Sequence, residues 1–126
     1  MKLLLLFLLV FGSRQANHTK FVAHDQTAQA DLTSIGISME QYKLLGGIYP
    51  STEQGISALF KKPKVAPLPR RWVQSLAEIP VDPWGRPYQY KLVKGKFTLW
   101  STGPDVKKAE DDLLYVVPKK EGIRGE

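Results

Sequence analysis

The residues with the clearest capacity for chemistry are acidic side chains late in the sequence. Asp105 follows the string Ser101-Thr102-Gly103-Pro104, and Glu110-Asp111-Asp112 follows after a short polar stretch. Calcium takes about six to eight oxygen ligands and combines carboxylates with backbone carbonyls. A loop that carries aspartates at both ends, with turn-forming Gly103-Pro104 to orient its carbonyls, therefore predicts a candidate calcium site.

A simpler interpretation of the same loop stays open. Asp105 is also a residue that closes a turn, and Asp111-Asp112 can be a solvated acidic pair. Lys107 and Lys108 lie between the aspartates and would lower the affinity for a cation by repulsion. The residue types alone do not decide between a metal loop and a structural one.

Other catalytic chemistry finds little support in the sequence. The chain contains no cysteine, and its histidines are His18 and His24, which we expect on exposed positions. A histidine base needs a nucleophile and an orienting carboxylate, and no such set is visible. Gly46-Gly47 lacks the lysine and hydroxyl of a phosphate-binding loop. We therefore expect neither catalytic residues nor an organic cofactor, and predict that the chain is not an enzyme.

The formal net charge of +6 raises the question of an acidic partner. The basic residues occur as short groups beside prolines, a pattern typical of a solvated face. These groups are Lys61, Lys62 and Lys64, then Arg70-Arg71, Lys107-Lys108 and Lys119-Lys120. We expect no nucleic-acid partner.

The N-terminal segment resembles a secretory leader. Lys2 precedes an apolar run from Leu3 to Phe11, and Gly12 and Ser13 follow. A positive charge, a short apolar core and small residues are the parts of a signal peptide, with cleavage predicted near Gly12. A membrane-spanning helix needs about 18 or more apolar residues, which exceeds this run. We predict a leader and linker over 1–20, a globular domain over 21–118 and a basic tail over 119–126, in an exported protein; a frayed apolar tail is the alternative.

The elements that position these residues form an α+β domain. The segment 21–45 predicts a helix that is longer than the core requires, so part of it should project, and Gly46-Gly47 should end it. Its expected buried face consists of Ala28, Leu32, Ile35, Met39 and Tyr42.

After this helix, the spacing of Ser51 and Gln54 matches a capping box and predicts a short second helix. A proline-rich loop should follow, anchored by Trp72 and Leu76. Period-two alternation over 88–92 and 96–99 predicts two strands joined by a tight turn at Lys94-Gly95, and the apolar run 113–117 predicts a third.

Three strings, taken in order, resemble a known family. They are Tyr49-Pro50-Ser51-Thr52-Glu53-Gln54-Gly55, then Asp82-Pro83-Trp84-Gly85-Arg86-Pro87-Tyr88, then Ser101-Thr102-Gly103-Pro104-Asp105. Together they resemble the major pseudopilin of the type II secretion system over about residues 28–113. The resemblance implies a pilin-like fold, in which a long N-terminal helix packs on a small antiparallel sheet.

The resemblance also implies a task. Members of this family stack into a periplasmic pseudopilus that serves protein secretion, so the expected partners are pilin-like subunits, either copies of the chain or minor pseudopilins, and other secretion-system components. The expected location is periplasmic, with the question of inner-membrane association left open. The family binds calcium in this loop, which implies Asp105, Asp111 and the Thr102 carbonyl as ligands of Ca²⁺, with Asp112 as a substitute for Asp111. Here Val106 stands where the family has glycine, and the loop is about one residue shorter.

The N-terminus departs further from the family pattern. Pseudopilins carry a prepilin-peptidase site followed by a long apolar helix with a glutamate near its start, whereas Phe11-Gly12-Ser13-Arg14 interrupts the apolar run here. Two interpretations follow: a soluble relative exported by an ordinary signal peptide, or a divergent or truncated gene. The alternative to a structural subunit is a free-standing exported binding module that has kept the pseudopilin fold.

Overall fold

The computed structural model describes the backbone of residues 2–104 and 113–115, and the side chains of these residues from Ala23 onward. A long helix, α1 (Lys2–Gly46), is followed by a short helix, α2 (Ser57–Phe60). Three strands then form one sheet: β1 (Gln89–Val93), β2 (Lys96–Ser101) and β3 (Leu113–Leu114). The predicted α+β architecture, with a long N-terminal helix on a small antiparallel sheet, is confirmed.

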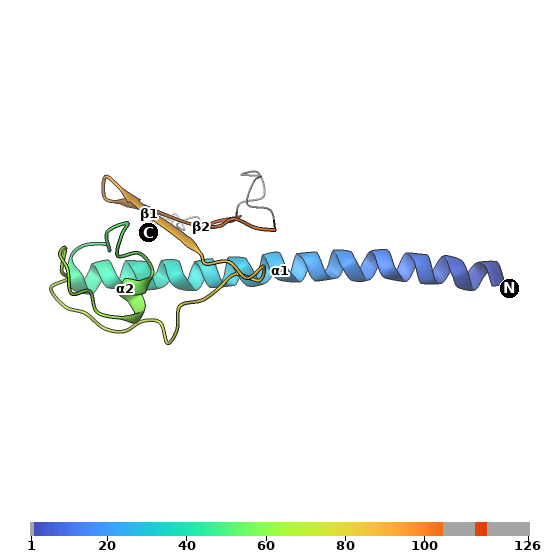
Figure 1. Cartoon of the computed structure of the whole chain (residues 1–126), viewed down its shortest axis with the longest axis horizontal. Coiled ribbons are helices and arrows are strands. Elements are labelled where there is room, and N and C mark those ends of the chain that lie inside the picture. The colour runs from blue at the N-terminus through green and yellow to red at the C-terminus, as the bar shows by residue number, and fades with distance from the viewer. Residues whose placement is uncertain (1, 105–112, 116–126) are drawn as a thin grey trace, which may run out of the picture.

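Helix α1 dominates the shape of the molecule. It begins at Lys2, earlier than the predicted start at residue 21, and its length is about 66 Å at about 1.5 Å per residue. Figure 1 shows that the sheet and the loops gather around its C-terminal part, while its N-terminal part extends away from them. The expected projection is therefore present. None of the described helices is long and apolar enough to cross a membrane. The predicted leader, domain and tail boundaries are not tested and stay predictions.

The predicted inner face of α1 is confirmed. Ala28, Leu32, Ile35, Met39 and Tyr42 are all buried. They form one cluster with residues of α2 and the sheet, which include Leu59, Tyr88 and Leu99. One residue expected off this face, Ser38, is buried as well. The apolar stripe of α1 is thus the base on which the remaining chain folds.

Helix α1 ends at Gly46-Gly47, as predicted. The amide of Gly47 donates to the carbonyl of Lys43 at 2.7 Å, and Gly47 has a φ of +86°. Glycine takes this left-handed conformation without steric penalty, so it reverses the chain directly after the last helical turn.

The sheet is antiparallel with the order β1-β2-β3. Tyr90 pairs with Leu99 and Leu92 with Phe97, and Ser101 pairs with Leu113. The turn between β1 and β2 has positive φ at both Lys94 (50°) and Gly95 (75°), which is the geometry of a two-residue hairpin. The first two predicted strands are confirmed, and the third is confirmed at its first two residues; residues 116–117 lie outside the described part.

The second helix starts later than its capping box predicts. Both capping bonds form: the Ser51 amide donates to Gln54 Oε1 at 3.0 Å, and the Gln54 amide donates to Ser51 Oγ at 3.1 Å. They close a turn, not a helix, because Gly55 has a φ of +58°, which a right-handed helix cannot contain. Helix α2 therefore begins only at Ser57.

The proline-rich loop after α2 is held by side chains that bond to backbone carbonyls. Trp72 Nε1 donates to the carbonyl of Ala58 at 2.7 Å. Gln54 Nε2 donates to the carbonyls of Val65 and Pro67 at 2.8 and 2.9 Å. Trp72 and Leu76 also pack against the core cluster, so their predicted anchoring role is confirmed.

Candidate functional site

The predicted calcium loop begins where β2 ends. Thr102 follows Ser101, the last residue of β2, and is half-buried. The other candidate ligands, Asp105, Asp111 and Asp112, lie outside the residues that the structure describes. Within the described part, no three His, Cys, Asp or Glu residues come together as a metal site. The structure thus shows where the predicted loop begins, and the role of its aspartates as calcium ligands stays a prediction.

A buried carboxylate lies directly beside this entrance. Asp82 is 4% exposed, and its Oδ2 accepts a hydrogen bond from Ser101 Oγ at 2.8 Å. Its Oδ1 accepts from the backbone amides of Trp84 at 3.1 Å and Arg86 at 2.8 Å. Hydrogen bonds to a charged acceptor are stronger than neutral ones. Asp82 therefore ties the 82–86 turn to the end of β2.

The same turn reaches the residue after Thr102. The amide of Gly103 donates to Ser101 Oγ at 3.2 Å, and the guanidinium of Arg86 donates to the carbonyl of Gly103 at 2.9 Å. Gly103 is held on both its amide and its carbonyl side, which fixes the backbone directly after Thr102. Asp82 and Arg86 thus position the first residues of the predicted loop.

In the sequence, residues 82–85 served only as part of a string that resembles the family. In the structure they form a tight turn, since the Gly85 amide donates to the Asp82 carbonyl at 2.9 Å and Gly85 has a φ of +84°. The role of the Asp82 side chain was missed. An aspartate before proline in a turn commonly accepts a bond from the amide two residues later, and this was the available signal.

Three tyrosine hydroxyls connect the sheet and the loops to their surroundings. Tyr88 donates to Asp31 Oδ2 at 2.7 Å, and burial together with this carboxylate raises the pKa of Tyr88 well above its usual value. Tyr49 donates to both carboxylate oxygens of Glu40, at 3.1 and 3.0 Å, and burial together with Glu40 raises the pKa of Tyr49 to about 12. Tyr90 donates to the carbonyl of Pro50 at 2.8 Å. Tyr88 and Tyr49 thus fix α1 against the rest of the domain, and Tyr90 ties β1 to the loop after α1.

An aromatic cluster fills the space between α1 and the sheet. Phe97 stacks on Tyr90 and Tyr115, with ring centroids 6.0 Å apart in each pair, and meets the edge of Tyr49 at 5.0 Å. Tyr115 also lies against Gly36, where a Cβ atom would overlap its ring. This close approach explains why α1 carries glycine in its middle. The aromatic rings thus pack α1 and the sheet together.

The whole arrangement matches proteins of one secretion apparatus. A family model described as the type II secretion system (T2SS), protein G, matches residues 16–117. The chain belongs to this family. It is similar to the type II secretion system core protein G of Pseudomonas aeruginosa, with 45% identity over 89 residues, which cover 68% of this chain and 63% of that relative. The core protein G of Dickeya chrysanthemi is 41% identical over 96 residues, which cover 71% of this chain and 61% of that relative.

A solved structure supports the same family. The crystal structure of the major pseudopilin from the type 2 secretion system of enterohaemorrhagic Escherichia coli matches with a TM-score of 0.69 and 36% identity, covering 77% of this chain and 86% of that one. The resemblance inferred from the three strings is therefore confirmed. The chain spans less than two thirds of the length of the two curated relatives named above. The family is one of structural pseudopilins, in agreement with the prediction that the chain is not an enzyme.

One of the two histidines that were expected on exposed positions, His24, is placed differently in the structure. His24 is half-buried, and its ring meets the Trp84 ring edge-on with centroids 6.0 Å apart. The expectation of an exposed surface position was wrong for His24, because α1 passes beside the 82–86 turn. The side chain of His18 lies outside the described ones.

The opposite face of α1 carries apolar side chains that are exposed. Ile37 is 60% exposed and Leu44 is 84% exposed. Residues seven positions apart lie on the same side of a helix, so these two side chains share a stripe that faces away from the core. A pseudopilin domain with such a stripe has a surface suited to packing against another helix.

Proposed function

We propose that the chain is a structural subunit of a type II secretion pseudopilus, working in the periplasm at the inner membrane in contact with other pilin-like subunits. The observation that carries this proposal is the long helix α1, packed on the sheet along one face and exposing Ile37 and Leu44 on another. Membership of the protein G family supports the same role. Copies of the chain and minor pseudopilins are the partners that fit it.

Cysteine crosslinking tests this proposal cleanly, because the chain has no cysteine of its own. Ile37→Cys and Leu44→Cys place thiols on the exposed stripe of α1, and Lys94→Cys places a matched exposed thiol on the hairpin tip. In cells that produce a type II secretion system, each single-cysteine α1 variant should form disulfide-linked dimers far more readily than the Lys94 variant. Monomers alone, or dimers that form equally without the secretion system, would refute the role.

We also propose that the loop after β2 binds Ca²⁺ through Asp105, Asp111 and the Thr102 carbonyl, with Asp112 able to replace Asp111. The support is the position of Gly103, directly after Thr102: its amide donates to Ser101 Oγ, and its carbonyl accepts from Arg86. Bound calcium would neutralise the aspartates and stabilise the folded state by mass action.

Thermal melts in millimolar calcium provide the test of this site. Calcium should raise the melting temperature, whereas magnesium should raise it less, because Mg²⁺ demands a stricter octahedral geometry. Asp105→Asn should abolish the calcium effect and leave the melt without metal close to that of the wild type. A melting temperature that calcium does not change would rule the site out without bearing on pseudopilus assembly.

A further inference from the structure

The positive charge of the chain is concentrated in one stretch. Residues 54–77 contain five of the 18 Lys and Arg residues and no Asp or Glu. The remaining 13 basic and 12 acidic residues nearly cancel. The five cations are all exposed: Lys61, Lys62, Lys64, Arg70 and Arg71. The net charge of +6 is therefore largely a property of α2 and the loop after it, and not of a generally basic surface.

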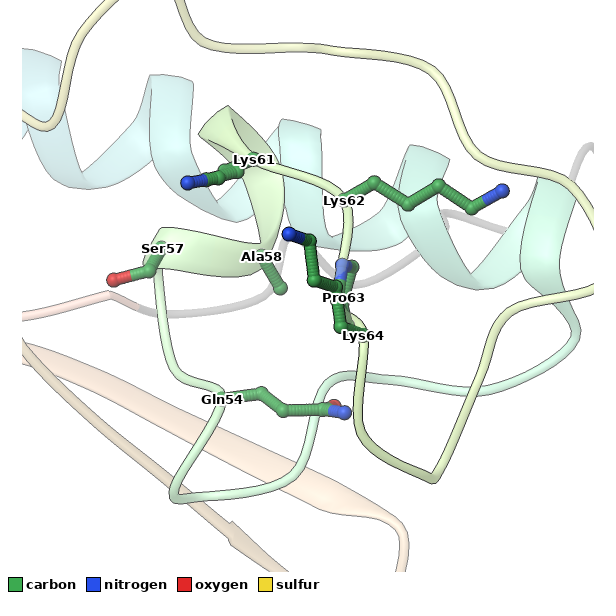
Figure 2. Close-up of a pocket in the computed structure, with 7 residues that line it drawn as sticks. All are labelled: Gln54, Ser57, Ala58, Lys61, Lys62, Pro63 and Lys64. Atoms are coloured by element: carbon green, nitrogen blue, oxygen red, sulfur yellow. The ribbon is translucent and has the colours of Figure 1, made fainter.

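A surface hollow lies within this stretch. It has a volume of about 270 Å³, and its lining includes Gln54, Ser57, Ala58, Lys61, Lys62 and Lys64. Figure 2 shows the lysines spread around it, with Lys61 and Lys62 extending in opposite directions. Ammonium groups that spread over a rim fit several carboxylates of one polymer better than a single small anion.

Apolar side chains are exposed among these cations. Val65 is 77% exposed, Leu68 is 55% exposed and Phe60 is 38% exposed. We name the combined surface of Lys61, Lys62, Lys64, Val65, Leu68, Arg70 and Arg71 the basic loop face. A surface that combines apolar and cationic groups matches a partner that presents apolar and acidic side chains.

The basic loop face is held in shape before any partner binds. Gln54 bonds to the carbonyls of Val65 and Pro67, and Trp72 bonds to the carbonyl of Ala58. The amide of Arg70 donates to the carbonyl of Gly46 at 3.0 Å, which ties the loop to the end of α1. A surface ordered in advance loses less conformational entropy on binding.

Two other anionic partners fit this surface less well. Single-stranded nucleic acid is bound by several exposed aromatic rings, whereas the aromatic residues of 54–77 are Phe60 and Trp72, and the indole N–H of Trp72 is committed to Ala58. A lipid surface suits the apolar run Leu3–Phe11, which lies at the far end of α1 from α2 (Figure 1). A polypeptide is the remaining class.

We propose that the basic loop face binds an acidic segment of a partner protein. Carboxylates of this segment meet Lys61, Lys62 and Lys64 around the hollow, and its apolar side chains cover Val65 and Leu68. The basic loop face does not include Ile37 or Leu44, so its side chains can be changed without altering the exposed stripe of α1.

Fluorescence anisotropy with the full chain and a labelled peptide of repeated Glu-Glu-Leu tests this proposal, with a Gln-Gln-Leu peptide as the uncharged control. The triple variant K61Q/K62Q/K64Q should weaken binding about tenfold, since surface ion pairs contribute about 0.2–1 kcal/mol each and about 1.4 kcal/mol corresponds to tenfold. The matched triple variant K91Q/K94Q/K96Q removes the same charge from the hairpin and should weaken binding less than about twofold. Thermal melts verify that both variants fold.

Further binding experiments determine which chemical groups of the partner the basic loop face recognises. V65S/L68S should weaken binding of the Glu-Glu-Leu peptide about threefold or more and leave a poly-glutamate peptide unaffected, because only the former offers apolar side chains. Equal losses for the two lysine variants would mean attraction by net charge alone and would overturn the proposal. Absence of peptide binding would overturn it as well. Tighter binding of oligo-dT or anionic vesicles, dependent on the same three lysines, would reassign the surface to another class of partner.

Discussion

The two sides of α1 are stabilised in different ways. On one side the sheet covers α1 with a half-buried aromatic cluster, and the adjoining turn is tied to β2 by the buried carboxylate of Asp82. On the other side α2 and the proline-rich loop lie against α1 with little regular structure, and the side chains of Gln54 and Trp72 hold them by bonds to carbonyls. Figure 1 shows the sheet above α1 and the loop below it. A buried bond costs more to break than an exposed one, so equivalent substitutions should affect the two sides unequally.

The largest effect should come from Asp82→Ala on the sheet side. It leaves the amides of Trp84 and Arg86 and the hydroxyl of Ser101 without their acceptor, which should lower the free energy of unfolding by about 3 kcal/mol or more. Asp82→Asn keeps an acceptor oxygen and should cost about half as much. Guanidinium denaturation measures both. Equal losses for the two variants would show that the charge of Asp82 is unimportant.

The next largest loss of stability should come from a steric overlap inside the aromatic cluster. Gly36→Ala places a methyl group in the space of the Tyr115 ring, and this overlap should destabilise the protein by about 1–2 kcal/mol even after the gain in helix propensity. Near-UV circular dichroism should report a change in the aromatic cluster. Ser34→Ala, at an exposed position of α1, is the control and should change stability by less than about 0.5 kcal/mol. An unaltered aromatic spectrum in Gly36→Ala would contradict the packing of Tyr115.

A smaller effect is expected on the loop side. Gln54→Ala removes the donors to Val65 and Pro67 and the acceptor of the Ser51 amide, and should cost about 1 kcal/mol, because these bonds are partly exposed to water. The loop should loosen, so trypsin should cleave after Lys61 or Lys64 sooner than in the wild type. Gln41→Ala, on the exposed surface of α1, should leave cleavage unchanged. A loss as large as that of Asp82→Ala would remove the contrast between the two sides.

Alkaline pH should weaken the sheet side gradually. Tyr49 has its pKa raised from 10.0 to about 12, so above pH 10 the unfolded chain loses this proton while the folded chain keeps it. The unfolded state then binds fewer protons, and the stability contributed by Tyr49 falls as the pH rises from 10 to about 12. Absorbance at 295 nm should show tyrosinate appearing later in the folded chain than in the unfolded chain. Tyr49→Phe should make the decline of stability less steep.

The smallest change in the free energy of unfolding is predicted for the removal of a buried hydroxyl group. Tyr42 Oη is buried and has no hydrogen-bond partner within the described part of the chain. Tyr42→Phe should therefore change the free energy of unfolding by less than about 0.5 kcal/mol, whereas Tyr88→Phe, which loses the bond to Asp31, should cost about 1.5 kcal/mol. Thermal melts compare the two. A large loss in Tyr42→Phe would reveal a polar contact at this hydroxyl.

The elements predicted most accurately from the sequence are those with a repeating pattern of apolar residues. The buried face of α1 follows from the spacing of Leu32, Ile35 and Met39, and the hairpin follows from alternation around Lys94-Gly95. Helix α2 was placed too early because the capping box is a local signal, and the positive φ of Gly55 that overrides it depends on the surrounding fold. Propensity yields to tertiary context at such points.

The polar contacts were harder to predict because they join distant residues. The bond of Asp82 to Ser101 spans 19 positions and that of Tyr88 to Asp31 spans 57, and no periodicity connects such pairs. The contact of His24 with Trp84 has the same character. The calcium ligands came from family resemblance, and Asp105, Asp111 and Asp112 stay predictions.

The order of the strands has a consequence for association between copies. Strand β1 lies at the edge of the sheet, with Lys91 exposed in its middle and Lys94 and Lys96 at the adjoining turn. If two copies joined their sheets through this edge, their lysines would be brought together, and repulsion would oppose the contact. Charged edges of this kind protect proteins from uncontrolled strand addition and amyloid-like growth. A domain so protected can be kept at high local concentration without its sheets fusing.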